Sequence, residues 1–294
     1  MLKEADLKGI FVPVITPFNT NEELDLDSYR RYLQMLCAHE IQGLIINGTT
    51  GESPAVSWEE VESLVYATKE SLIGVNKQMP FIIGTGTNHT LSTVKRTEAA
   101  GQLGADAVLV VTPYYSRPSQ EGIVEHFRRV AQVGVPVIAY EVPARTGIRL
   151  TADTMRKILD IEGVIGLKDS SGGTQLITEL KSRVAKPILC GEDIYLLELL
   201  ALGASGGILA SANVQTDAFI EVIRLASSGS SANYLKAKQL FDSLTPLIQK
   251  LFQESNPSPL KWMLARQGII SSDTLRLPMV SITEELQVQL EQLL

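Results

Sequence analysis

The chain has 294 residues, of which 45% are hydrophobic and 20% are charged, and its formal net charge is −7. An acidic chain without a run of lysine or arginine lacks the basic face that phosphates require, so we exclude nucleic acid as a partner. No run of about 18 apolar residues occurs, so no membrane span is expected, and the N-terminal stretch MLKEADLKGI lacks the apolar region of a signal peptide. Cys37 and Cys190 lie far apart and are typical of free thiols in a reducing compartment, which favours the cytoplasm.

Short apolar runs alternate with segments of helical spacing along most of the chain. The runs begin near Gly9, Gly43, Pro80, Ala105, Val135, Val164, Pro187 and Gly206. They are rich in β-branched residues without strict alternation, which is typical of parallel strands that are covered on both faces. Ser57, Thr90 and Thr151 are suitable N-terminal caps for three of the intervening helices. Eight such units predict an α/β fold of the closed (β/α)8 TIM-barrel type.

A doubly wound open sheet is the alternative fold. It would place a glycine-rich phosphate loop after the first strand, and the stretch ITPFNTNEELD at that position offers none. From residue 231 onward the apolar runs stop and only helical patterns remain. We therefore predict a barrel over residues 1–230 and an added C-terminal helical portion over residues 231–294 that packs on the barrel.

Reactive residues of a TIM barrel lie at the carboxyl ends of the strands and on the loops that follow. In this chain those positions are crowded with small, hydroxylated and aromatic residues. They are the stretches TP, NGTTGES, GTGTN, TPYYSRP, YEVPARTG, KDSSG, CGED and ASAN. We therefore expect the functional site at this rim.

Lys168 ends the apolar run VIGLK and precedes the turn DSSG. A lysine that points into a barrel is charged and unpaired, paired with an acid, or neutral, and an unpaired buried charge costs several kcal/mol. Asp169 would point to the opposite face of the strand, which removes it as a partner. Lys168 is thus either a desolvated amine that forms a Schiff base with a ketone, or a structural lysine that reaches the rim or pairs with an acid.

The stretches NGTTGES and YEVPARTG supply further candidates. Residues 48–53 form either a turn whose free N–H groups hold a carboxylate, or a generic turn between a strand and a helix. Tyr140 would end the fifth strand beside Lys168 and transfer protons, and Arg145 would bind a carboxylate at the mouth. Taken singly, these two residues also fit a packed tyrosine and a surface arginine.

The combination decides between these alternatives. A strand-end lysine, a neighbouring tyrosine, an anion-binding turn and an arginine at the mouth, all on one rim, form a Schiff-base site for an α-keto acid. Tyr114 and Tyr115 stay ambiguous, because adjacent aromatic residues on a loop are also typical of interfaces.

The same stretches carry a resemblance to a known family. GTTGES, TPYYSRPSQEG, YEVPARTG and GLKDSSG are followed, in order, by NPSPLKW and LRLPM. Along essentially its whole length the chain resembles the dihydrodipicolinate synthase/N-acetylneuraminate lyase family of class I aldolases. The tyrosine pair, Arg145 and the two C-terminal stretches resemble the synthase branch, since the sialic-acid lyase pattern lacks that arginine.

The resemblance implies catalytic roles. Lys168 would form an imine with pyruvate, and Tyr140 would act as acid and base for imine formation and the later steps. Thr49 would link Tyr140 to Tyr115 of a neighbouring subunit, which completes a proton relay. The usual assembly of the family, a homotetramer built from tight dimers, would then supply a residue that an isolated chain lacks.

The resemblance also implies the substrates. The N–H groups of Thr49 and Thr50 would hold the pyruvate carboxylate, with Ile208 and Gly191 lining the same pocket. Arg145 would bind the carboxylate of aspartate 4-semialdehyde, and the product would be 4-hydroxy-tetrahydrodipicolinate, on the path to diaminopimelate and lysine. No metal or organic cofactor is expected, because the protonated imine on Lys168 is itself the electron sink.

Glu141 departs from the family pattern, since the synthases commonly have asparagine after the tyrosine. As an extra carboxylate near the mouth, we expect it to disfavour a dicarboxylate-like substrate pair. This departure bears on the second substrate more than on the imine chemistry.

The lysine-feedback site of some family members is only partly present in this chain. Ser53, Asn88 and Tyr114 match it, whereas two histidines and a glutamate are replaced by Trp58, Val61 and Ser92. We expect weak or absent inhibition by lysine, because the effector's amine lacks the counter-charge of that glutamate. Turnover measured with added lysine checks this, and half-inhibition at sub-millimolar lysine would contradict it.

Two other functions remain open. The first is a different pyruvate or 2-keto-3-deoxy acid aldolase or dehydratase of the same family, because KDSSG and a mouth arginine suit any acidic acceptor. The second is a non-catalytic keto-acid-binding protein, against which the intact Lys168, Tyr140 and Thr49 argue. A metal-dependent aldolase is disfavoured, since none of His39, His89 and His126 falls on a strand end.

Overall fold

The computed structural model describes residues 1–180 and 184–294. Among these residues eight parallel strands close into a barrel in the chain order β1 to β8. The strands are β1 (Gly9–Pro13), β2 (Gly43–Ile46), β3 (Phe81–Gly84), β4 (Ala107–Val111), β5 (Val137–Glu141), β6 (Val164–Asp169), β7 (Ile188–Cys190) and β8 (Gly206–Ile208). The predicted TIM barrel is confirmed, because each apolar run of the sequence contains one of these strands.

Helices follow the strands in the expected order. They are α1 (Leu26–Cys37), α2 (Trp58–Gly74), α3 (Thr90–Gln102), α4 (Gln120–Ala131), α5 (Pro143–Thr146), α6 (Ala152–Leu159), α7 (Gln175–Leu180), α8 (Leu196–Ala201), α9 (Thr216–Ala226), α10 (Ser231–Leu251), α11 (Ser258–Arg266) and α12 (Glu284–Glu291). Short 3-10 turns lie at Glu4–Asp6, Thr49–Gly51, Ser53–Ala55, Asp193–Tyr195 and Ser211–Asn213.

Two of the three predicted helix caps are present. Ser57 caps α2 with a capping box to Glu60, and the Thr151 hydroxyl accepts the Thr154 N–H at the start of α6. The predicted cap at Thr90 is wrong, because Thr90 is already the first residue of α3. Its hydroxyl hydrogen-bonds to His126 Nδ1 at 3.0 Å instead of capping its own helix.

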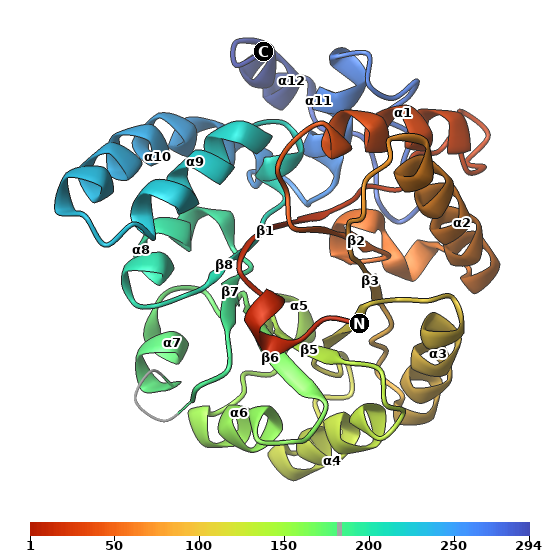
Figure 1. The fold of residues 1–294 in the computed structure, drawn as a ribbon. Helices are drawn as coiled ribbons and strands as arrows, with labels where there is room; N and C mark the ends of the chain where they lie inside the picture. The colour runs from red at the N-terminus through yellow and green to blue at the C-terminus, as the bar shows by residue number, and fades with distance from the viewer. Residues whose placement is uncertain (181–183) are drawn as a thin grey trace. The chain divides into compact units, whose positions relative to one another are not determined.

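The chain divides into two compact units, and the first contains Met1–Phe11 and Pro80–Leu209. Figure 1 shows α3, α4, α6, α7 and α8 following one another along the outer side of β3 to β8. Packing follows the helical period, since Ile123, Phe127 and Val130 on α4 are all buried. Within this unit the polar side chains at the carboxyl ends of β4, β5 and β6 come together, because neighbouring parallel strands end at one edge.

The second unit contains Val12–Met79 and Ala210–Leu294. Here α1 packs on α2, α10 packs on α9, and α11 and α12 pack on each other. The C-terminal helical portion expected after residue 230 is present as α10 to α12. A domain boundary at residue 230, with residues 231–294 packed on the barrel, stays a prediction.

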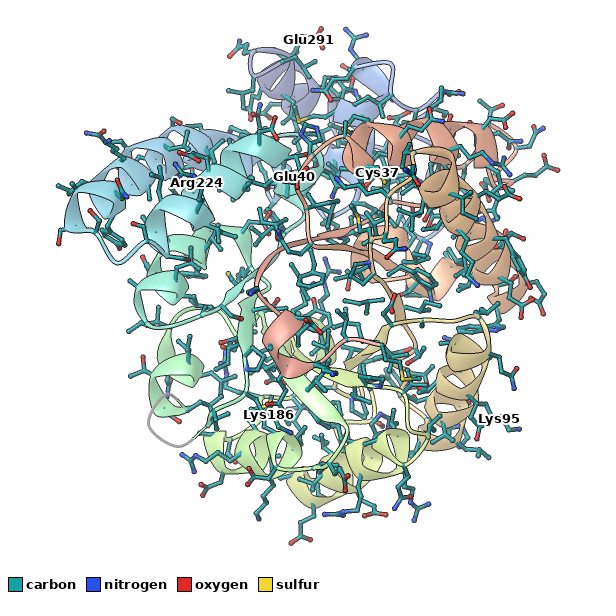
Figure 2. The ribbon with its side chains drawn as sticks, viewed as in Figure 1. Cys37, Glu40, Lys95, Lys186, Arg224 and Glu291 are labelled. Carbon is teal, nitrogen blue, oxygen red and sulfur yellow. The ribbon has the colours of Figure 1, made fainter. Side chains whose placement is uncertain are left out.

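Charged side chains lie mostly on the outer sides of the helices. Figure 2 shows Lys95 on α3 and Glu291 on α12 pointing away from the elements that their helices cover. Glu291 forms an ion pair with Arg266, with 2.7 Å between the nearest nitrogen and oxygen. None of the described helices is long and apolar enough to span a membrane.

Candidate active site

Lys168 lies near the carboxyl end of β6, where the strand register pairs it with Tyr140 of β5 and Leu189 of β7. Its side chain is 6% exposed, and its Nζ atom lies 4.3 Å from the centroid of the Tyr140 ring. The Nζ atom forms no hydrogen bond or ion pair with any residue that the structure describes. Lys168 is therefore shielded from water without being engaged by an acid.

Gly191 follows β7 and leaves the space that the Lys168 side chain occupies. A Cβ atom added at Gly191 would lie 2.7 Å from both Cγ and Cε of Lys168. Carbon atoms in van der Waals contact are about 3.5–4.0 Å apart, so any larger residue here would displace the lysine. Ile208, the other predicted lining residue, is fully buried at the end of β8 and pairs with Phe11 of β1.

Two acidic residues follow Tyr140 and Lys168 on their strands, and they point to the other face of the sheet. Glu141 pairs in register with Asp169, and both side chains are buried. Burial raises the pKa of both carboxyls, since desolvation disfavours their charged forms. The expectation that Glu141 presents a free carboxylate near the mouth is wrong, because its side chain is 0% exposed and hydrogen-bonded within the protein.

Arg145 lies on the short helix α5, which begins at Pro143. It is exposed, and it forms no ion pair with the residues described here. Its guanidinium is therefore available for a carboxylate from outside the chain. Thr146, next to it, is buried and donates its hydroxyl hydrogen to the Ile148 carbonyl at 3.0 Å, which anchors the loop from within.

Tyr115 lies on the loop after β4 and has an unusual exposure and backbone conformation. It is 89% exposed and has a φ of +69°, a left-handed conformation that is uncommon for an aromatic residue. Its neighbour Tyr114 is only partly exposed. Tyr115 is thus turned away from its own chain.

Thr49 and Thr50 belong to the second unit, where they begin the 3-10 turn Thr49–Gly51. Their N–H groups precede the first hydrogen bond of the turn, which runs from the Gly51 N–H to the Gly48 carbonyl at 3.0 Å. The Thr50 hydroxyl accepts a hydrogen bond from Asn256 Nδ2 at 3.1 Å. The turn therefore has the N–H groups that the sequence predicts, while the link from Thr49 to Tyr140 of the first unit stays a prediction.

A buried ion pair that the sequence does not predict lies next to this turn. Lys261 Nζ lies 2.6 Å from Glu52 Oε1, with side-chain exposures of 0% and 2%. The same Nζ atom donates to the Thr274 carbonyl at 2.7 Å. The only sequence signal for this ion pair is a lysine inside the apolar stretch PLKWML. Its partner, Glu52 in GTTGES, cannot be identified from sequence spacing.

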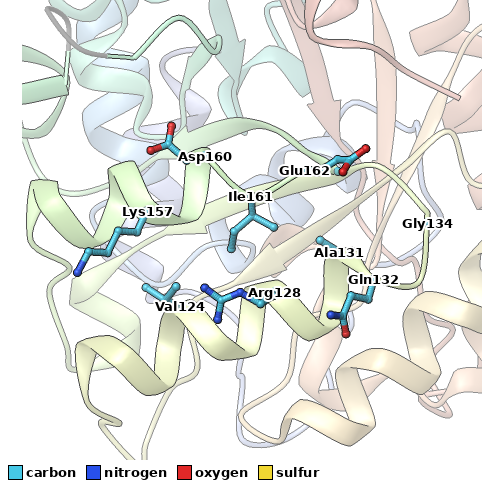
Figure 3. A pocket seen from close by; sticks show the side chains of 10 residues that line it. Val124, Arg128, Ala131, Gln132, Gly134, Lys157, Asp160, Ile161 and Glu162 are labelled. Carbon is cyan, nitrogen blue, oxygen red and sulfur yellow. The ribbon is translucent and has the colours of Figure 1, made fainter.

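One surface hollow lies away from these residues. It has a volume of about 870 Å³ and lies between α4 and α6, with Arg128, Lys157, Asp160 and Glu162 among its lining residues (Figure 3). Its floor includes Gly134 and Gly163, which come just before β5 and β6. It is therefore at the amino ends of these strands, opposite to Tyr140 and Lys168.

The described residues contain no group of three or more His, Cys, Asp or Glu side chains arranged to hold a metal ion. His126, the most buried histidine, lies on α4, and burial lowers its pKa to about 4. Its ring is thus a neutral packing group at ordinary pH.

Comparisons with known proteins agree along the whole chain. The model of the dihydrodipicolinate synthetase family matches residues 6–294. A 4-hydroxy-tetrahydrodipicolinate synthase of Thermomicrobium roseum is 39% identical over 279 residues, which cover 94% of this chain and 90% of that protein. Another, from Methanothrix thermoacetophila, is 36% identical and covers 98% of this chain and 96% of that protein.

Solved structures give the same result. The dihydrodipicolinate synthase of Thermotoga maritima superposes with a TM-score of 0.91 at 35% identity, covering 97% of this chain and 96% of that chain. The enzyme from Acinetobacter baumannii, solved in complex with pyruvate, has a TM-score of 0.90 at 34% identity and covers 97% of both chains. The chain therefore belongs to the dihydrodipicolinate synthetase family.

Proposed function

We propose that the chain condenses pyruvate with aspartate 4-semialdehyde to 4-hydroxy-tetrahydrodipicolinate, through an imine on Lys168. The observation that carries this proposal is the buried Lys168 amine, which has no acid partner among the described residues and lies against the Tyr140 ring. An amine in such a place can add to a carbonyl, whereas one paired with a carboxylate would be held as a cation.

The reaction begins with attack of the Lys168 amine on the pyruvate ketone. Tyr140 passes a proton to the carbinolamine oxygen, water leaves, and the imine forms. Loss of a methyl proton then gives the enamine, whose carbon attacks the aldehyde of the second substrate. The amine of that substrate finally adds to the imine carbon and displaces Lys168, which closes the ring and frees the enzyme.

The other predicted residues have supporting roles in this scheme. The N–H groups of Thr49 and Thr50 hold the pyruvate carboxylate, and Arg145 binds the carboxylate of the semialdehyde. The exposed Arg145 guanidinium supports its part. No organic cofactor or metal enters the scheme, because the cationic imine withdraws the electrons that the carbon–carbon bond formation requires.

We further propose a cytoplasmic homotetramer built from tight dimers. Tyr115 supports this assembly, because a tyrosine that is 89% exposed and held in a left-handed conformation is turned outward, where it can contact a partner, and tyrosines are enriched at interfaces. In such a dimer Tyr115 enters the site of the neighbouring subunit, where Thr49 connects it with Tyr140.

The test is chemical trapping followed by a substrate panel. Borohydride added with pyruvate should reduce the imine and leave one adduct, which peptide mapping places on Lys168. Turnover with aspartate 4-semialdehyde should exceed that with a panel of 2-keto-3-deoxy sugar acids. An unmodified Lys168 would overturn the imine and support the binding-protein reading, while an adduct with a preference for a sugar acid would support the other aldolase reading.

A further inference from the structure

Glu141 joins two loops that border the candidate site. Its Oε1 atom accepts the Leu150 N–H at 2.9 Å, and its Oε2 atom lies 3.0 Å from the Thr112 hydroxyl. Thr112 directly follows β4 and begins the loop that carries Tyr115. Leu150 ends the loop that starts after Glu141 and carries Arg145. The buried Glu141 carboxyl thus ties the end of the Arg145 loop back to β5, the strand from which this loop departs.

The Thr112 hydroxyl has a single hydrogen to donate, and this favours the protonated form of the Glu141 carboxyl. The Thr112 hydroxyl lies 3.1 Å from the Tyr140 carbonyl and 3.0 Å from Glu141 Oε2, but a hydroxyl has one hydrogen to donate. If Glu141 is ionised, both neighbours are acceptors and one contact lacks a hydrogen. If Glu141 carries a proton on Oε2, it donates to the Thr112 oxygen, which donates to the Tyr140 carbonyl.

The charged side chains near Glu141 also favour its protonated, neutral form. Asp169 on β6 pairs in register with Glu141, and its Oδ2 atom is buried without a hydrogen-bond partner in the described part of the chain. Arg149, which lies on the loop and is exposed to water, is a nearby cation whose charge lowers the pKa of Glu141. Burial raises the pKa of Glu141 and the neighbouring Asp169 raises it further, while the hydrogen bonds from Leu150 and Thr112 lower it without cancelling the rise. Two buried acids side by side do not both ionise at low cost.

We propose that Glu141, as a neutral carboxylic acid, is a positioning residue that holds the Arg145 loop in place for the second substrate. The other ties of this loop do not replace it. Gln120 of α4 holds the residues on either side of Leu150, through the Arg149 carbonyl and the Thr151 N–H, each at 3.1 Å, whereas Glu141 ties Leu150 to β5, the strand from which the loop departs. The inference rests on the proposed function, because it takes Arg145 as the ligand of the semialdehyde carboxylate.

Two variants separate the neutral hydrogen-bonding group from the charge. Glu141→Gln keeps an acceptor for the Leu150 N–H and a donor for Thr112, whereas Glu141→Ala removes both. We expect the KM for aspartate 4-semialdehyde to rise about tenfold in Glu141→Ala and to stay within about twofold of wild type in Glu141→Gln. The KM for pyruvate and the trapped adduct on Lys168 should be unchanged in both. Glu121→Ala, at an exposed glutamate on α4, is the matched control.

The pH profile distinguishes positioning by the neutral acid from simple packing. Because the fold raises the pKa of Glu141, its proton is bound below that raised value and is lost as the pH rises through it. The KM for the semialdehyde should therefore increase with pH in wild type more than in Glu141→Gln, which has no proton to lose. Equal profiles for the two proteins would overturn the neutral form.

Hydrogen exchange at the Leu150 amide tests the tie without relying on turnover. We expect wild-type exchange in Glu141→Gln, and faster exchange with a lower melting temperature in Glu141→Ala, because the buried Leu150 N–H loses its acceptor. If exchange and the semialdehyde KM are both unchanged in Glu141→Ala, the inference is wrong. If wild type forms no adduct on Lys168, the proposed function is wrong instead, while the exchange result still decides whether Glu141 holds the loop.

Discussion

Lys168→Ala is expected to lower kcat for the condensation of pyruvate with aspartate 4-semialdehyde by roughly a thousandfold or more, because no other group can form the imine. Lys168→Arg should fail equally, since a guanidinium stays protonated and is not a nucleophile. The measurement is steady-state turnover together with borohydride trapping. Lys95→Ala, which removes an exposed lysine on α3 in the same unit, should retain wild-type activity and serves as the control.

The stability of the lysine variants gives an independent check on the same residue. The Lys168 amine has no acid partner among the described residues, so its burial costs free energy that the fold must offset. A Lys168→Met variant should therefore unfold at the same temperature as wild type or at a higher one, while losing activity. A large fall in melting temperature would show that the lysine is structural, which is the alternative reading that its position in the sequence left open.

The barrel, and the meeting of Tyr140 and Lys168 at its strand ends, could be predicted because they depend on local patterns. Each apolar run is long enough for one strand, and the intervening helical segments leave a parallel arrangement as the simplest solution. Strand register then places Tyr140 beside Lys168, so two residues 28 positions apart in the sequence meet by topology alone. Side-chain alternation also predicts that Asp169 turns away from the lysine.

The features that the sequence did not reveal depend on contacts between distant residues. Glu141 was expected near the mouth because it follows Tyr140; side-chain alternation already turns it to the other face, but its partners Thr112 and Leu150 depend on how the loops pack. The predicted cap at Thr90 failed for a similar reason, since His126 of another helix engages its hydroxyl. Neither partner can be identified from spacing, because each depends on how separate elements pack.

Lys261 is the clearest example of a contact that the sequence does not predict, because its partner Glu52 lies 209 positions away. Lys168 and Lys261 are both lysines in apolar stretches, and sequence alone treats them alike. The structure separates them, since Lys168 has no acid partner among the described residues whereas Lys261 forms a buried ion pair. A lysine in the core is therefore a reactive candidate only after its possible acid partners have been placed.

The Glu52–Lys261 pair connects the turn that contains Thr49 to the C-terminal portion of the same unit. Glu52 adopts a left-handed conformation directly after the turn, and its Oε2 atom accepts the Arg276 N–H at 3.3 Å. Lys261 Nζ also lies 4.3 Å from the centroid of the Phe18 ring. Burial lowers the pKa of Lys261 although the Glu52 carboxylate raises it, so the pair is costly to desolvate and depends on both partners.

Lys261→Met should therefore destabilise the protein by about 3–5 kcal/mol, because it leaves the Glu52 carboxylate buried without its ion-pair partner. The double variant Glu52→Gln/Lys261→Met removes both charges of the pair, and we expect it to recover most of the lost stability. Thermal and denaturant unfolding of wild type, both single variants and the double variant form a mutant cycle that measures the coupling. Because the pair supports the turn that we propose binds the pyruvate carboxylate, the double variant should also show a raised KM for pyruvate with an unchanged KM for the semialdehyde. A double variant no more stable than Lys261→Met would mean that packing of the lysine stem, rather than its charge, holds this part of the unit together.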